Sequence, residues 1–292
     1  MSADACWIIG PVTTDLFERD RRVPGGSVSY AARVAASFGL TARILTAVGP
    51  DADLDALAGH EVRVVPGATQ TFAHDFPGGR RRLRVVARPG RTLSAADVPA
   101  SWGAPGTLIL APLLPDDIDL ASFLDGWPEV ETALLAQGLQ RDTDAEGVVR
   151  HLGAPAPALL AAARANVTVF LSEEEIEAWP DGALDALARS VRRVVLTRGA
   201  LGARIMAGGE VVEVPASPAD PVDPTGAGDV FATAFILGVR AGDRAAGRLA
   251  AAMAAAAVMV RGPAPLPARA AIESRLVAPD PGGVAPDEGP SA

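Results

Sequence analysis

The sequence contains no lysine, so all 26 of its cationic side chains are arginines. This absence excludes three kinds of enzyme. A Walker-A phosphate loop and a protein kinase each need a lysine at a fixed place in their motifs. Schiff-base catalysis needs a lysine amine. If this chain handles phosphate at all, it must balance the negative charge with arginine, backbone amides or magnesium.

Cysteine and asparagine are almost absent as well, with Cys6 and Asn166 as single examples. One cysteine excludes an intrachain disulfide and a cysteine-based zinc site. The net charge of −9 argues against a nucleic-acid partner, which would favour a basic face. The longest apolar run, 249–260, is shorter than the roughly 20 residues that a membrane span requires, and no signal peptide is visible. We therefore expect a soluble, cytoplasmic protein.

Short apolar runs alternate with helical segments along most of the chain. This alternation predicts a doubly wound, largely parallel sheet sandwich of the α/β class. Helices are expected at 28–38, with Ser27 as N-cap, at 51–57, and twice between 226 and about 260. The expected strands lie at 6–9, 43–48, 61–65, 107–110, 132–136, 167–171, 194–197, 203–206 and 210–214.

Residues 69–88 differ from the rest, because two strand-like runs with one polar face flank Pro77-Gly78-Gly79. This pattern predicts a β-hairpin appended to the main sheet. The last segment, 278–292, is rich in proline, glycine and acidic residues. Such a composition buries too little apolar surface to fold, so we expect a disordered tail.

The most informative segment is 221–231, which reads Pro-Val-Asp-Pro-Thr-Gly-Ala-Gly-Asp-Val-Phe and opens a long helix. Gly226 and Gly228 allow the backbone amides of 226–229 to point toward one place, and a helix N-terminus adds partial positive charge. The pattern predicts an anion pocket. Asp229, in the first turn, is either a simple helix-terminal acid or a general base. Beside an anion, a carboxylate makes chemical sense as the base that deprotonates a hydroxyl attacking phosphate.

The string at 223–231 resembles the C-terminal signature of the PfkB, or ribokinase-like, family of small-molecule kinases. Gly25-Gly26 followed by Tyr30-Ala31 is similar to the N-terminal signature of that family. The resemblance runs in order over roughly residues 5 to 277. It implies one ribokinase-like α/β domain over 1–277, with a reduced β lid built from about 69–88 plus part of 12–24.

The resemblance also implies roles for individual residues. Asp229 matches the catalytic base of the family. The anion hole for the transferred phosphoryl group is matched by Gly226, Ala227 and Gly228. Asp223 also matches a position near the monovalent-cation site of family members that have one. The residues implied to bind the nucleotide are Thr197, Gly199, Gly202, Asp223 and Thr225. Those implied to bind the substrate are Asp15, Gly25, Gly26, Tyr30, Gln137 and Arg141, the last two of which follow a predicted strand end.

The family motif Asn-x-x-Glu, tied to magnesium and phosphate, is matched here by Ser172 to Glu175. Glu175 matches the glutamate of that motif and is expected to contact magnesium through a water molecule. Two residues depart from the family pattern, with Ser172 in place of the asparagine and Tyr30 in place of the asparagine common in sugar kinases. A third departure is the short segment between Asp15 and Gly25, where ribokinase inserts lid strands, so we expect a small lid built mainly from 69–88. The run Glu173-Glu174-Glu175 could also be only a solvated helix start.

Several weaker features allow both a functional and a purely structural interpretation. We expect His60, His74 and His151 to be non-catalytic, with His74 the one to watch because it lies on the proposed lid. Arg80-Arg81-Arg82 could meet phosphate or form a solvated turn. Residues 69–72 could line the pocket or serve only as lid strand.

Together these features predict an ATP- and Mg²⁺-dependent kinase that phosphorylates a hydroxyl of a small polyol or sugar, with an inositol-like acceptor favoured. Two alternatives stay open: a nucleoside kinase of the same family, and a non-catalytic relative that binds a nucleotide or sugar. The expected oligomeric state is a monomer or a homodimer. No nucleic-acid or membrane partner is expected.

Overall fold

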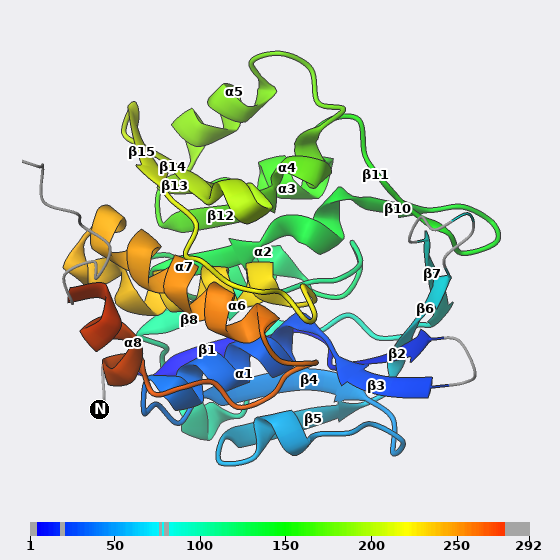
Figure 1. Cartoon of the computed structure of the whole chain (residues 1–292). Helices are drawn as coiled ribbons and strands as arrows, with labels where there is room; N and C mark the ends of the chain where they lie inside the picture. Colours follow the sequence, from blue (N-terminus) through cyan, green and yellow to red (C-terminus); the bar gives the residue numbers. More distant parts are fainter. Residues whose placement is uncertain (1–4, 18–20, 76–77, 79–81, 278–292) are drawn as a thin grey trace, which may run out of the picture.

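The computed structural model of the chain describes residues 5–17, 21–75, 78 and 82–277. Its centre is a nine-stranded sheet in the order β15-β14-β13-β12-β9-β8-β1-β4-β5 (Figure 1). The strands from β13 to β5 are all parallel, and β14 and β15 extend the sheet antiparallel. The bounds are β1 (Cys6–Ile9), β4 (Arg43–Val48), β5 (Glu61–Pro66), β8 (Thr107–Leu110), β9 (Thr132–Leu135), β12 (Val167–Ser172), β13 (Arg193–Thr197), β14 (Ala203–Ala207) and β15 (Glu210–Val214). The predicted α/β class and strand positions are confirmed.

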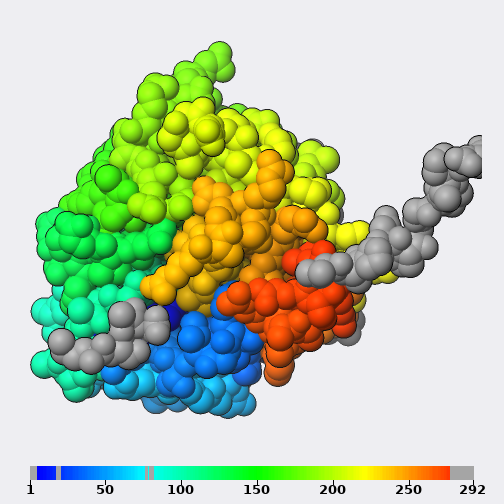
Figure 2. Space-filling view, turned by 90° about the vertical axis from the view of Figure 1, so that its left-hand side faces the viewer, coloured from blue at the N-terminus to red at the C-terminus, as the bar shows by residue number. Residues whose placement is uncertain are grey.

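Helices cover both faces of this sheet, which explains why its strands are continuous apolar runs. Alternate strand residues enter two separate cores, so that Ile8 packs on one face and Trp7 on the other. The Ile8 face is covered by α1 (Ser27–Ser37), α6 (Ala227–Gly238), α7 (Asp243–Val258) and α8 (Arg269–Val277). In Figure 2 these C-terminal helices, in orange and red, lie against the blue N-terminal part of the chain. The Trp7 face is covered by α2 (Leu120–Gly126), α3 (Pro157–Ala161), α4 (Glu173–Ile176) and α5 (Ala183–Ser190).

No helix among the residues that the structure describes is long and apolar enough to cross a membrane. Two local expectations about helices are wrong. Ser27 is the first residue of α1 rather than its N-cap, which is Gly26 with a φ of 90°. The segment 51–57 forms only a short 3-10 turn at Asp55–Leu57, because the carboxylate of Asp53 accepts a hydrogen bond from the backbone of Asp55 and holds a turn instead of a helix start.

A second, four-stranded sheet in the order β3-β2-β6-β7 lies at one end of the main sheet (Figure 1). We call this sheet the lid. Its strands are β2 (Thr13–Phe17), β3 (Arg21–Gly25), β6 (Gln70–Asp75) and β7 (Arg82–Ala87). The hairpin predicted within 69–88 therefore forms, but 13–25 contributes as many strands, because β2 pairs in parallel with β6. A short hairpin of β10 (Arg141–Thr143) and β11 (Val149–His151) adjoins β7.

Two contacts anchor the lid to the end of β4. The hydroxyl of Thr69 donates to Asp51 at 2.6 Å, and Arg22 pairs with the same carboxylate at 3.0 Å. Thr69 thus helps to attach the base of the lid to the main sheet. The predictions for Arg80, Arg81 and the tail at 278–292 concern positions outside the described residues.

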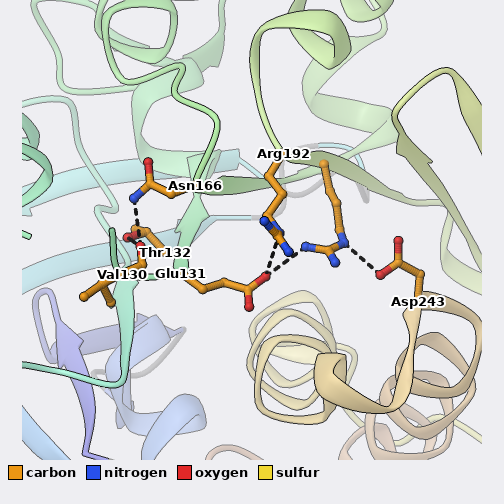
Figure 3. A network of polar contacts seen from close by, with 7 residues as sticks. Val130, Glu131, Thr132, Asn166, Arg192 and Asp243 are labelled. Atoms are coloured by element: carbon orange, nitrogen blue, oxygen red, sulfur yellow. Dashed lines mark hydrogen bonds and ion pairs between the residues drawn. The ribbon is translucent and has the colours of Figure 1, made fainter. Parts of the chain in front are cut away.

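A network of ion pairs and a hydrogen bond connects the main sheet to a helix where the central strands begin, at the end opposite to the lid (Figure 3). Glu131, which precedes β9, pairs with Arg192 at 3.2 Å and with Arg193 at 2.8 Å. Arg193 also pairs with Asp243, in the first turn of α7, at 2.8 Å. Nearby, Asn166 donates to the carbonyl of Val130 at 2.8 Å. The network connects α7 to the beginnings of β9 and β13, at the strand ends that lie away from the lid.

Candidate active site

The chemistry-bearing residues gather where the parallel strands end and the lid begins. Open α/β sheets place their ligands at the carboxyl ends of their strands. Gln137 follows β9, Glu175 follows β12, and Thr197 ends β13. Because these strands are parallel, their ends lie at one edge of the sheet. Residues that are distant in sequence therefore lie close together at the ends of neighbouring strands.

The residues of the predicted anion pocket lie at the N-terminus of α6. Gly226 is the N-cap, with a left-handed φ of 78°, and a Cβ there would collide with the ring of Tyr30. Tyr30 is buried, with its ring against this turn. The amide of Ala227 donates to the carbonyl of Pro224 at 3.3 Å. The next two amides, those of Gly228 and Asp229, lie in the first turn, where a helix offers no internal acceptor. They are the donors best placed to bind an anion.

Asp229 lies half-buried in that first turn. Burial raises the pKa of Asp229 to about 6, while a hydrogen bond from Ser27 and the positive charge of Arg141 act in the opposite direction. A carboxyl with this pKa is mostly ionised at neutral pH and accepts a proton more readily than an ordinary aspartate. These properties suit a general base. The contact also joins the two sequence signatures, since Ser27 directly follows Gly25-Gly26.

Arg141 is a buried cation that interacts electrostatically with both Asp229 and Glu175. It is 9% exposed, donates from Nη1 to the carbonyl of Leu113 at 3.0 Å, and lies over the ring of Phe72 at 5.8 Å from the centroid. Its charge lowers the pKa of both Asp229 and Glu175. A buried guanidinium near two acids is the kind of group that can balance negative charge in a site.

Glu175 is 4% exposed and closes a capping box with Ser172. Its Oε2 accepts from the backbone of Ser172 at 3.0 Å, and its own amide donates to the Ser172 hydroxyl at 3.4 Å. Burial raises the pKa of Glu175, although the Ser172 amide, Arg141 and a hydrogen bond from Gln137 lower it. The solvated-helix interpretation is therefore wrong for this residue, whose side chain is buried among site residues.

Magnesium fits this arrangement only as an ion carried by the phosphoryl donor. Among the described residues, no cluster of three or more His, Cys, Asp or Glu side chains is placed to hold a metal. Mg²⁺ at phosphate-transfer sites needs only one or two carboxylates, because substrate phosphates and water fill the other positions. Glu175, which interacts with both Arg141 and Gln137, is the carboxylate that would meet such an ion.

The lid presents Asp15 to the same region. Asp15 is buried in β2, and its Oδ1 lies 3.4 Å from Nε2 of His74. A Cβ added to Gly25 would lie 2.8 Å from Oδ2 of Asp15. Any residue other than glycine at this position would therefore displace the carboxylate. Gly26 adopts a φ of 90° and packs tightly on the backbone of Pro11. The two glycines thus bring the start of α1 against the lid.

The predicted nucleotide residues lie farther along the same edge. Thr197 donates to the carbonyl of Leu171 at 3.3 Å. Gly199 and Gly202 form the following turn with φ values of 53° and 89°. Burial alone would raise the pKa of Asp223, but hydrogen bonds from Thr225 and Gly262 together with the charge of Arg261 lower it. This carboxylate ties the entry of α6 to the segment after α7.

An exposed apolar surface adjoins Asp223. Val222 is 55% exposed, Met259 45% and Val260 37%. The amides of Val222 and Asp223 both donate to the carbonyl of Val258, which keeps the two segments together. We call Val222, Met259 and Val260 the apolar shelf. Arg198, in contrast, pairs with Glu213 of β15.

Direct contacts and charges connect Asp229, Arg141, Glu175 and Gln137, and the lid brings Asp15 against Gly25. Sequence reasoning missed Ser27 as the partner of Asp229, although its place after two glycines at a helix start was a usable signal. His60 is structural, as it accepts from the amide of Ala42 at 3.0 Å. The individual binding roles stay predictions.

Comparisons with known proteins agree with this fold. The sequence model described as pfkB family carbohydrate kinase matches residues 122–269. No curated protein is matched. Among solved structures, the ribokinase of Arabidopsis thaliana complexed with ribose and ATP is 18% identical, with a TM-score of 0.73 over 95% of this chain and 100% of that chain.

Two other solved structures have similar scores. A pyrophosphate-dependent kinase in the ribokinase family, complexed with a pyrophosphate analog and myo-inositol, is 17% identical, with a TM-score of 0.74 over 92% of this chain and 99% of that chain. The nucleoside kinase of Methanocaldococcus jannaschii is 17% identical, with a TM-score of 0.73 over 94% of this chain and 98% of that chain. At these identities the structures establish the fold, which is ribokinase-like. Since the family match spans half of the sequence, this chain belongs to the pfkB family of carbohydrate kinases.

Proposed function

We propose that this protein is an ATP-dependent kinase that phosphorylates a hydroxyl of a neutral polyol or sugar. The observation that carries the proposal is Asp229, a half-buried carboxyl with a pKa of about 6 in the first turn of α6, next to two backbone amides without internal acceptors. A base and an anion pocket within one helical turn are what hydroxyl phosphorylation requires.

In the proposed reaction, Asp229 takes the proton of the acceptor hydroxyl while that oxygen attacks the terminal phosphorus of ATP. The bond between this phosphorus and the bridging oxygen breaks, and ADP leaves with the bonding electrons. The amides of Gly228 and Asp229 and the charge of Arg141 stabilise the transferred group. Glu175 would face a magnesium ion bound to the donor phosphates, and such an ion would neutralise part of their charge. Asp15 holds the acceptor from the lid side.

The choice of ATP over pyrophosphate rests on the apolar shelf. Val222, Met259 and Val260 expose large apolar side chains beside Asp223 and the entry of α6. An apolar surface next to an anion pocket suits a purine base attached to the phosphates, because burial of the base is favourable. Pyrophosphate has no group that such a surface could bind. The shelf therefore supports a nucleoside triphosphate as the donor.

An inositol-like or sugar acceptor is favoured over a nucleoside by the polar surroundings of the acceptor side. Asp15, Gln137 and Arg141 are hydrogen-bonding groups suited to several hydroxyls. The proposal is tested with purified protein, Mg²⁺ and ATP against inositols, sugars and nucleosides, with phosphorylated product measured by mass spectrometry. Phosphorylation of nucleosides alone would identify a nucleoside kinase. Absence of product from every acceptor, with nucleotide still bound, would identify a non-catalytic binding protein and refute the proposal.

Two variants test the assigned groups. Asp229→Asn should lower kcat by about 10²–10⁴-fold, because a positioned base is worth that much, whereas Asp185→Asn, on the exposed face of α5, should retain full activity. Met259→Asp should raise the KM for ATP by about 10-fold or less while leaving the KM of the acceptor unchanged. Preference for pyrophosphate in the wild-type protein, with no effect of Met259→Asp, would refute the donor assignment.

A further inference from the structure

One face of the lid packs against the main domain. Strands β2 and β6 pair in parallel, with Asp15 opposite Phe72, and paired residues of neighbouring strands share a face. His74, two residues after Phe72, lies on the same face. Phe72 packs against Leu113 and Leu114 of the main domain. This face of the lid therefore looks toward the strand ends, and it carries both Asp15 and His74.

The carboxylate of Asp15 is held from two sides. Its Oδ1 lies 3.4 Å from Nε2 of His74, and its Oδ2 faces the position where Gly25 lacks a side chain. Asp15 is 8% exposed. A buried carboxylate that could rotate freely would lose part of its hydrogen-bonding geometry. The contact with His74 on one oxygen and the close packing against Gly25 at the other instead restrict the carboxylate to one orientation.

His74 is itself fixed. It is 4% exposed, and its ring stacks on Phe17 with centroids 4.5 Å apart and planes 16° from parallel. The guanidinium of Arg21 lies on Phe17 as well, 4.4 Å from the ring centroid. The three stacked groups come from three strands, β6, β2 and β3. An imidazole held in this way has little freedom to move away from Asp15.

We propose that His74 is a positioning residue that fixes Asp15 for hydrogen bonds from the acceptor. Both oxygens of a fixed carboxylate accept hydrogen bonds, so neighbouring hydroxyls can donate to them together. This inference rests on the proposed function, because it assigns the acceptor side of the same site.

The test measures acceptor binding apart from catalysis. Isothermal titration with myo-inositol and with ribose, without donor, is carried out on the wild-type protein, His74→Leu and His74→Gln. Leucine keeps the bulk without a donor group, and glutamine restores an N–H. His74→Leu should weaken binding of the bound acceptor and raise its KM by about 10-fold, with kcat and the KM of the donor within about two-fold. His74→Gln should recover most of the affinity.

A double mutant separates positioning from a general effect on the lid. In an Asp15→Asn background, His74→Leu should weaken acceptor binding by less than about two-fold, because the group that His74 positions has already lost its charge. Equal weakening in both backgrounds, or a fall in kcat with an unchanged KM, overturns the proposal. If His74→Leu does not fold, His74→Asn, which is too short to reach Asp15, replaces it. Binding without phosphate transfer in the wild-type protein overturns only the proposed function, whereas binding of neither compound overturns this inference.

Discussion

Replacement of Asp229 by asparagine should make the protein more stable while it removes activity. Burial raises the pKa of Asp229 from the ordinary 3.8 to about 6 in the folded protein. The folded state therefore binds a proton more tightly than the unfolded state. Below pH 4 the carboxyl is protonated in both states and costs nothing. As the pH rises from about 4 to 6, the unfolded chain ionises first, so the free energy of unfolding falls.

The size of this effect follows from the pKa difference. Each pKa unit corresponds to 1.36 kcal/mol, so a difference of about two gives an upper bound near 3 kcal/mol at pH 7. Asp229 is only half-buried, and solvent screening reduces the expected gain of Asp229→Asn to about 1–3 kcal/mol. Asparagine has nearly the same shape and keeps a hydrogen bond with Ser27. The variant thus changes the charge with little change in packing.

Urea unfolding of ligand-free wild type and Asp229→Asn at several pH values between 4 and 8 measures the difference. The gain in the free energy of unfolding should be near zero at pH 4, increase up to about pH 6 and stay constant at higher pH. Asp223→Asn provides a control of opposite sign, because the pKa of Asp223 is lowered and its ionised form stabilises the fold above pH 4. A difference that does not vary with pH, or a wild type that is the more stable protein at pH 7, would refute the reasoning.

Three further predictions concern other parts of the molecule. Gly226→Ala should reduce both stability and donor binding in denaturation and titration experiments, since its φ of 78° and the adjacent aromatic ring leave no room for a Cβ, whereas Gly228→Ala meets open space and should fold normally. Glu131→Gln should lower the free energy of unfolding by about 1–3 kcal/mol with unchanged kcat, because it leaves a largely buried guanidinium short of a partner, whereas Asp125→Asn, in an exposed pair, should cost less than about 1 kcal/mol. Arg141→Gln should move the acidic limb of the pH–kcat profile to higher pH, because the positive charge lowers the pKa of the base. An unmoved limb, or equal costs for the two carboxylate variants, would contradict these assignments.

Much of the fold could be predicted because its signals are local. Buried parallel strands are short apolar runs, and β4 and β8 begin and end where the sequence analysis placed them. The helix start at 226 was visible from its glycines and its acid. The extent of the lid was harder to predict. The strands at 13–17 and 21–25 carry polar and charged residues, and their place is set by pairing with β6, which is distant in sequence.

The sequence alone determined the class of the protein, because an unbroken signature places two glycines and an acid at one helix start, and the absence of lysine leaves amides and arginine to balance phosphate charge. Only the tertiary structure decided how the site works. It placed Ser27 on Asp229, Arg141 within the electrostatic reach of two acids and His74 beside Asp15. These groups come from different strands and helices, and a pKa depends on burial and on neighbouring charges, which packing brings together and spacing along the chain does not encode.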